Sequence, residues 1–334
     1  MRGAHTLLPI LCLLAACDKP MAWGDANSII VGMDPAQWEE TGGQVYDALE
    51  PRVFTVRDER MFDVTHASPS DPRWPRFREF KRVLLVGEPG DAWLAEALER
   101  VGGDTPTPAA VAEAEDVWAR HQQVVIVLTR PGRGAGHALA LLEEAGERFQ
   151  RDFRRYVLER MYTSGADTER ARQLRREVGF SLTVPELYDG ERVAPNAYLF
   201  RNDHPDPSEL IRSILVTWRE PDGTPISTSE AVRWRELAAQ EFYQPPQLSE
   251  SGDIQPIRLR GEGWEATEIR GVWSSPPEAW PAAGPFTARV VSCHGDDRVY
   301  LLDSWLYAPG KAKYEYMIQL WTILDTFACG PGRG

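Results

Sequence analysis

The feature that most constrains the fold of this 334-residue chain is a run of five apolar residues, Val124–Leu128. A strand that is apolar at every position must be covered on both faces, which is typical of a sheet between helices. Residues Leu139–Met161 then carry apolar side chains at three- and four-residue steps, which predicts a long amphipathic helix. A charged helix is predicted over 168–178, where Gly179 ends it. The first half of the chain is therefore predicted to be a helix-covered sheet.

The second half of the chain is dominated by strand patterns with two helices between and after them. The helix signals are the Thr228-Ser229-Glu230 cap, with apolar positions to Phe242, and the stripe within Lys311–Thr326. The predicted strands cover 180–185, 197–201, 211–218, 257–259, 264–273, 286–292 and 299–307. We predict an α+β fold of two α/β sandwich subdomains flanked by helices. The N-terminal sheet is expected to be mixed and the C-terminal sheet antiparallel.

The N-terminus has the proportions of an export signal. Arg2 precedes an apolar run, Leu7–Ala16, that is shorter than the roughly 20 residues needed to cross a bilayer. The segment Leu14-Ala15-Ala16-Cys17 resembles a bacterial lipobox, which implies lipidation of Cys17 and removal of residues 1–16. An ordinary secretory signal with a chance cysteine is the alternative. We predict a signal peptide over 1–16, a tether over 17–27, and subdomains over 28–178 and 179–328.

The charge of the chain limits its partners. The formal net charge is −13, and removal of the signal takes away one arginine and no acid. A surface this acidic argues against nucleic acid as a partner and against flat binding to anionic lipid. The N-terminal lipid is then the expected contact with the membrane.

Cysteine usage indicates a disulfide more readily than a metal site. Cys12 would leave with the signal and Cys17 would carry the lipid, so Cys293 and Cys329 remain as an even pair in an oxidising compartment. A disulfide between them is one interpretation, and two unbonded thiols are the other. The six histidines are scattered and no Cys/His spacing is typical of zinc, so no metal and no cofactor are predicted.

Four side chains form the candidate binding site. Arg270, Trp273, Arg289 and Asp303 all fall within predicted strands of one sheet, where charges are costly unless paired. An Arg–Asp pair beside tryptophan would suit the floor of a pocket for an anionic or sugar-like ligand. An internal ion pair or a solvent-facing edge is the alternative interpretation.

A glycine-rich segment, Gly132–Gly136, lies between a strand and a helix, where a phosphate-binding loop would sit. It lacks the third glycine of the dinucleotide pattern and has no Gly-Lys-Ser/Thr, so we interpret it as a turn. No catalytic residues are assigned.

Several short motifs in a fixed order resemble a bacterial lipoprotein family catalogued as domain of unknown function 4837. They span Ile29 to Phe327 and include the sequences Phe62-Asp63-Val64-Thr65-His66, Gly179 to Pro185, Arg270-Gly271-Val272-Trp273 and Gly284-Pro285-Phe286. The order of strands and helices is also reminiscent of the PsbP-like fold. The resemblance implies an envelope lipoprotein and no particular activity.

These features favour a lipid-anchored protein of the cell envelope, facing the periplasm, with the choice between inner and outer membrane left open. The preferred interpretation is a non-enzymatic binding or scaffolding protein with an envelope protein as partner. A small-ligand binding or transport accessory protein is the second hypothesis. A hydrolase of envelope substrates with an unfamiliar site is the third.

Overall fold

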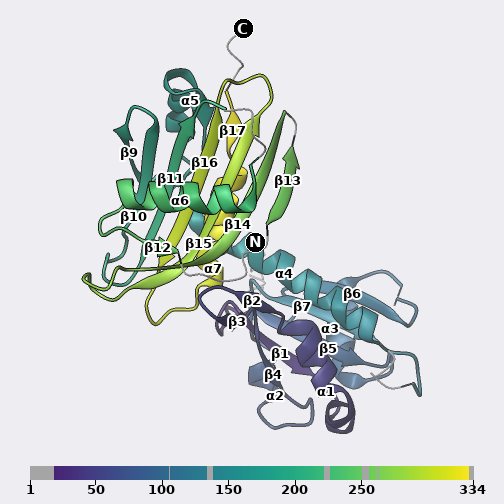
Figure 1. Ribbon diagram of the computed structural model, residues 1–334. Coiled ribbons are helices and arrows are strands. Elements are labelled where there is room, and N and C mark those ends of the chain that lie inside the picture. The colour runs from purple at the N-terminus through teal and green to yellow at the C-terminus, as the bar shows by residue number, and fades with distance from the viewer. Residues whose placement is uncertain are drawn as a thin grey trace, which may run out of the picture. The chain divides into compact units, whose positions relative to one another are not determined.

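The computed structural model describes residues 19–104, 106–133, 138–221, 226–249, 256–261 and 263–330, and the side chain of Leu139 is not described. The chain divides into two compact units, which are labelled by element in Figure 1. The N-terminal unit contains the described residues up to Leu49 together with Phe62–Phe149. The C-terminal unit contains Glu50–Met61 and the described residues from Gln150 onward.

The N-terminal unit is built on a five-stranded mixed sheet with the order β4-β1-β5-β7-β6. The first four of these strands pair in parallel, and β6 pairs antiparallel with β7. Its elements are β1 (Ser28–Gly32), α1 (Pro35–Leu49), β4 (Asp63–His66), α2 (Trp74–Phe77), β5 (Arg82–Gly87), η1 (Ala92–Leu94), α3 (Ala95–Val101), β6 (Ala110–Glu115), β7 (Gln123–Leu128) and the first part of α4 (Leu139–Met161).

Helices cover the sheet of the N-terminal unit because its central strands are apolar on both faces. Every residue from Val124 to Leu128 in β7 is fully buried, as the unbroken apolar run predicts. Leu94 and Ala97 pack with alternate residues of β5 and β7 in one core cluster. Helices α1 and α4 approach closely at Gly146, where an added Cβ would lie 2.7 Å from the carbonyl oxygen of Ala48.

The C-terminal unit is built on an eight-stranded antiparallel sheet, drawn in green and yellow in Figure 1. Seven strands follow the order β12-β14-β15-β16-β11-β10-β9, and β13 also pairs with β14. Its elements are β2 (Arg52–Phe54), β3 (Asp58–Arg60), the second part of α4, α5 (Thr168–Glu177), β8 (Phe180–Ser181), β9 (Asp189–Ala194), β10 (Ala197–Asn202), β11 (Ile211–Arg219), α6 (Thr228–Phe242), β12 (Leu248–Ser249), β13 (Ile257–Gly261), β14 (Trp264–Ser274), β15 (Ala283–Cys293), β16 (Val299–Tyr307), α7 (Tyr314–Asp325) and β17 (Ala328–Cys329).

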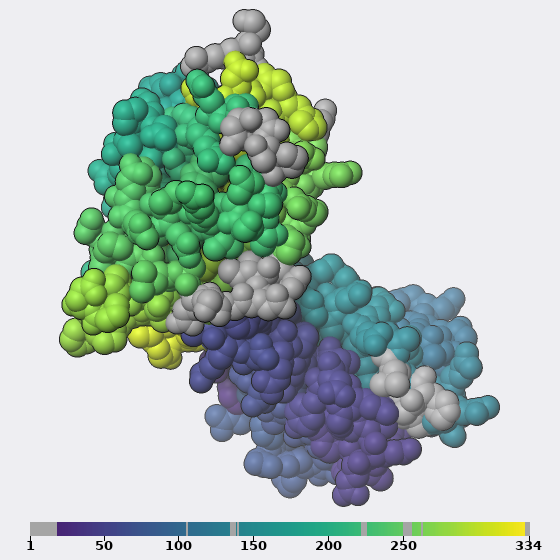
Figure 2. All heavy atoms as spheres, in the orientation of Figure 1, coloured from purple at the N-terminus to yellow at the C-terminus, as the bar shows by residue number. Residues whose placement is uncertain are grey.

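The two faces of this sheet carry different helices. On the face that we call the α6 face, α6 contacts β14, β15 and β16, and its alanines pack on Ile269, Phe286 and Ala288. Figures 1 and 2 show α6 lying across the strands and its side chains covering the middle of this face. On the opposite α7 face, α7 contacts β16 and β11 through residues such as Leu320 and Ile323. The predicted α+β class, with a mixed and an antiparallel sheet, is confirmed.

The division between the units falls earlier than the predicted boundary at 178/179. It lies within α4, between Phe149 and Gln150. The physical reason is that the end of α4 and all of α5 bury their apolar side chains in the C-terminal core, where Met161, Leu174 and Val178 pack with the strands. Amphipathic spacing identifies these helices but does not say which sheet they cover.

A disulfide joins Cys293 at the end of β15 to Cys329 in β17, with their Cα atoms 5.9 Å apart. The bond connects the C-terminal end of the chain to the main sheet across a sequence separation of 36 residues. A loop of that length should stabilise the folded state by about 3–4 kcal/mol, through the restriction of the unfolded chain.

We expect the double substitution Cys293→Ser/Cys329→Ser to lower the free energy of unfolding by about 3–4 kcal/mol, because the unfolded chain regains its freedom. Urea unfolding monitored by circular dichroism measures this change. Dithiothreitol should shift the wild-type midpoint in the same direction and leave the double variant unaffected. Equal midpoints for the wild type and the variant under oxidising conditions would contradict the prediction.

Candidate functional site

The four residues predicted to form a pocket lie on opposite faces of the C-terminal sheet. Arg270 and Trp273 are in β14, Arg289 is in β15 and Asp303 is in β16. Because successive side chains of a strand point to opposite faces, Arg270 and Arg289 lie on the α7 face, whereas Trp273 and Asp303 lie on the α6 face. The structure therefore does not bring the four together as one site.

The two arginines on the α7 face share one buried carboxylate. The side chain of Glu268, which is 1% exposed, accepts hydrogen bonds from Arg289 at 2.8 and 3.0 Å and from Arg270 at 2.9 Å. Arg289 also bonds Asp325 of α7 at 3.0 Å, and the Arg270 guanidinium lies over the ring of Trp321. This network fastens α7 to the sheet. For Arg270 and Arg289 the structure therefore agrees with the alternative interpretation of the sequence, an internal ion pair, and not with the floor of a pocket.

Asp303 pairs with an arginine that the sequence analysis did not single out. Its Oδ2 lies 3.3 Å from Nε of Arg235 in α6 and accepts a 2.8 Å hydrogen bond from the hydroxyl of Tyr243. The side chains of Arg235 and Asp303 are both fully buried. Burial raises the pKa of Asp303, while the charge of Arg235 and the hydrogen bond from Tyr243 act in the opposite direction.

Arg235 also forms hydrogen bonds with the segment that follows α6. Its guanidinium donates to Oε1 of Gln247 and, at 3.0 Å, to Oγ of Ser249 in β12, and it lies 4.1 Å from the centre of the Phe286 ring. Burial and the neighbouring Asp303 carboxylate raise the pKa of Tyr243 well above its ordinary value, so its hydroxyl stays protonated. The Arg235–Asp303 pair thus fixes both α6 and residues 243–249 on the sheet.

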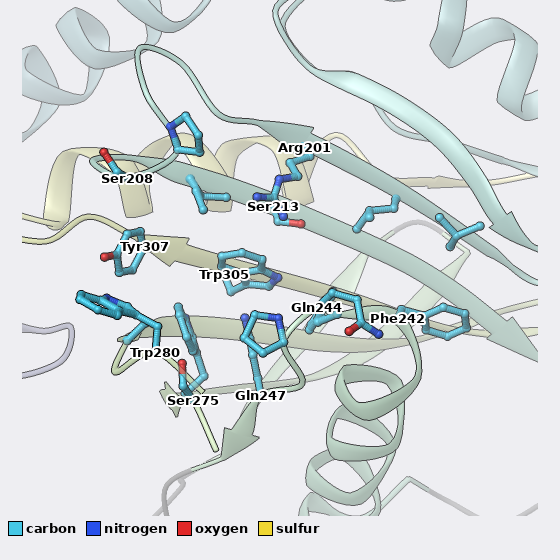
Figure 3. A pocket seen from close by; sticks show the side chains of 18 of the residues that line it. Arg201, Ser208, Ser213, Phe242, Gln244, Gln247, Ser275, Trp280, Trp305 and Tyr307 are labelled. Carbon is cyan, nitrogen blue, oxygen red and sulfur yellow. The ribbon is translucent and has the colours of Figure 1, made fainter. Parts of the chain in front are cut away.

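Beyond the C-terminal end of α6, the α6 face is open and forms a pocket of about 620 Å³ (Figure 3). Six aromatic residues line it: Phe242, Tyr243, Trp273, Trp280, Trp305 and Tyr307. Further apolar residues are Val193, Leu199, Pro207, Ile211, Pro245 and Ala282. Polar lining comes from Glu191, Arg201, Ser208, Ser213, Gln244, Gln247 and Ser275. We call this cavity the sheet pocket.

The aromatic rings of the sheet pocket support one another. Trp305 lies edge-to-face against Trp273 and Tyr243, with ring centroids 5.3 and 5.6 Å apart. The indole N–H of Trp273 donates to the carbonyl oxygen of Leu306 at 3.2 Å. Trp273 is therefore the one predicted site residue that lines the pocket, and the network of rings holds its orientation.

Gly284 makes room for this tryptophan. It stands opposite Trp273 in the β14–β15 pair, and a Cβ at Gly284 would lie 1.8 Å from the Leu306 carbonyl oxygen and 2.8 Å from the Trp273 indole nitrogen. The Gly284-Pro285-Phe286 motif noted in the sequence therefore has a packing reason, since only glycine permits the approach of the chain to Leu306 at this point.

The polar residues of the lining are serines, glutamines, one arginine and one glutamate. None of the described lining residues is a histidine, cysteine or lysine, and Glu191 is the one carboxylate among them. A serine nucleophile requires a neighbouring base to take its proton, and none of these side chains is a histidine or lysine. The described part of the pocket thus supplies aromatic surface and hydrogen-bonding groups.

Other sequence predictions fall outside the site. Cys17 lies outside the described residues, as do residues 134–137 of the glycine-rich segment, while the N–H of Gly132 donates to Oε1 of Glu88 at 2.8 Å. Among the described residues, no group of three or more His, Cys, Asp and Glu side chains is placed to hold a metal ion. Within the same residues, no helix has the length and apolar character needed to span a membrane.

Two family models divide the chain between them. Residues 167–326, within the C-terminal unit, match the family described as domain of unknown function DUF4837. Residues 22–164 match a second domain of unknown function, DUF8532. The resemblance to the first family is thus confirmed, but it covers the C-terminal part only rather than the span from Ile29 to Phe327. No curated protein matches the chain.

Several solved structures resemble part of the chain. Cyanobacterial PsbP from Synechocystis sp. PCC 6803 is 11% identical, with 45% of this chain and 86% of that chain covered and a TM-score of 0.32. LpqN of Mycobacterium tuberculosis, involved in cell envelope biogenesis, is 15% identical, with 46% and 83% covered and a TM-score of 0.29. The Ran-binding protein Mog1p of Saccharomyces cerevisiae is 12% identical, with 45% and 90% covered and a TM-score of 0.32. None of these similarities bears on function.

We expect Arg235→Met to lower the free energy of unfolding by about 3–5 kcal/mol, because it leaves the Asp303 carboxyl buried without its cation. The double variant Arg235→Met/Asp303→Leu should recover most of this loss. Arg270→Met is the matched control, since that arginine is 42% exposed and its ion pair should contribute at most about 1 kcal/mol. Urea unfolding that gives Arg235→Met and Arg270→Met the same stability would contradict the assignment.

Proposed function

We propose that this chain is a cell-envelope protein that binds a small molecule in the sheet pocket of its C-terminal unit. The observation that carries the proposal is the pocket itself, a cavity of about 620 Å³ with aromatic walls and a few polar side chains. Ligand sites in proteins are typically concave, about 300–1,000 Å³ in volume and lined mainly by apolar and aromatic residues. This pocket has those properties.

The geometry supports ligand binding above the two other hypotheses. A scaffolding surface would be expected to expose a broad apolar patch, whereas the aromatic residues here converge on a concave site. A hydrolase would need an activated nucleophile or paired acid and base, which the described lining does not supply. Small-ligand binding, the second hypothesis from the sequence, is therefore the proposed role.

The proposed location rests on the N-terminal sequence. The apolar run Leu7–Ala16 followed by Cys17 supports lipidation at that cysteine, and a polar tether over 17–27 would connect the lipid to the folded units. The net charge of −13 would keep the folded part soluble near an anionic membrane surface. The proposal leaves the choice of membrane open.

Ser213→Leu, which places a larger side chain on the pocket floor, should abolish saturable binding of the neutral apolar fluorescent probe N-phenyl-1-naphthylamine. We expect the wild type to bind this probe with a blue-shifted emission, because the aromatic walls exclude water. Ser229→Leu is the matched control, since the same change occurs at an exposed residue in the first turn of α6. Equal probe binding by the two variants would argue against the pocket as the binding site.

Cys17→Ser should abolish palmitate labelling and release the protein from the membrane fraction, because the thiol that accepts the lipid is lost. Cys12→Ser is the matched control, since that cysteine lies in the segment proposed to be removed. Mass spectrometry of the purified protein and fractionation of cells measure both effects. If Cys17→Ser retains its label and its membrane association, the lipid anchor does not exist.

A further inference from the structure

The mouth of the sheet pocket presents an aromatic ring to solvent. Trp280 is 81% exposed although it lies on the lining of the cavity, and Figure 3 shows it beside Tyr307. It belongs to the loop between β14 and β15, in which Pro276, Pro277 and Pro281 restrict the backbone. A tryptophan held at a pocket mouth with its faces uncovered offers a flat apolar surface on which a ligand can stack.

Polar groups without protein partners surround these aromatic faces. No described residue accepts a hydrogen bond from Nη1 or Nη2 of Arg201, and none bonds the side-chain amide of Gln244. The hydroxyl of Ser275 is buried and also lacks a partner. In Figure 3, Arg201 lies on one side of Trp305 and Gln244 on the other. Both side chains line the pocket and can donate to a ligand in it.

The charges at the site do not favour an anion. Nε of Arg201 donates to both carboxylate oxygens of Asp203, at 2.7 and 2.9 Å, so the positive charge is already compensated. Glu191, which also lines the pocket, adds a negative charge. An anionic ligand would therefore gain little from Arg201 and would be repelled by Glu191, whereas a hydroxyl group can donate to a carboxylate and accept from a guanidinium.

We infer that the ligand of the sheet pocket is a neutral pyranose sugar or the sugar portion of a larger envelope glycan. A pyranose ring presents apolar C–H groups on its faces and hydroxyls around its perimeter. This matches a pocket that offers the exposed ring of Trp280 for stacking and has Arg201, Gln244 and Glu191 in its polar lining. An aliphatic chain would displace water from the partly exposed guanidinium of Arg201 without replacing its hydrogen bonds, at a cost in affinity. This inference rests on the proposed ligand-binding function.

Saturation-transfer NMR of the full-length protein tests the ligand class. The probes are methyl β-glucoside, maltose and cellobiose as neutral sugars, glucuronate as an acidic sugar, and indole and 1-octanol as neutral apolar compounds. We expect the neutral sugars to bind, with the strongest transfer to their ring C–H protons. Arg201→Met and Gln244→Leu, which keep the apolar surface and remove donors, should each weaken sugar binding about tenfold or more.

The outcomes distinguish the inference from the proposed function. Saturable binding of 1-octanol or indole that Ser213→Leu abolishes, with no transfer to any neutral sugar, would overturn the sugar assignment and leave the binding pocket standing. Tighter binding of glucuronate than of the neutral sugars by tenfold or more would also overturn it. Failure of every probe, including N-phenyl-1-naphthylamine, would overturn both. Circular dichroism of Arg201→Met and Gln244→Leu shows whether each variant is folded.

Discussion

The α6 face of the C-terminal unit depends on a buried ion pair between Arg235 of α6 and Asp303 of β16. Two fully buried charges are tolerable only if they meet each other and find further hydrogen bonds, which Tyr243, Gln247 and Ser249 provide. This requirement fixes where α6 ends and how the chain leaves it. The pocket exists because the helix stops there and leaves the outer strands of the sheet uncovered beside Trp273 and Trp305.

The sequence predicts much of the fold because burial leaves a clear pattern in it. The apolar run of β7 and the stripes of α4 and α7 were identified at their correct places. Strand β6 is not predicted, because five of its six residues, Ala110–Glu115, are alanine or glutamate, which have low strand propensity, although Ala112 and Ala114 face the core. Strand β9 was missed too, since it is a charged edge strand with little burial.

The site was less predictable because it depends on which strands become neighbours. The sequence predicts an Arg–Asp pair beside tryptophan, and the pocket lining does include one arginine, Arg201, which pairs with Asp203 and lies near Trp305. The sequence pointed instead to Arg289 and Asp303. These two side chains lie on opposite faces of the sheet, but the register that places them there is fixed only when β15 and β16 pair. Arg270 and Trp273 are three positions apart in one strand, so the alternation of side chains between the two faces of a sheet already predicts from the sequence that they point to opposite faces.

The central claim is that the uncovered part of the α6 face binds a small molecule of the envelope. The most direct measurement is 19F NMR of the protein labelled with 5-fluorotryptophan, during addition of a small-molecule extract of envelopes from the cells that make it. The account predicts that the resonances of Trp273, Trp280 and Trp305 shift while those of Trp38 and Trp118 in the N-terminal unit do not. Shifts confined to the N-terminal unit, or no shift at the three pocket tryptophans, would contradict it.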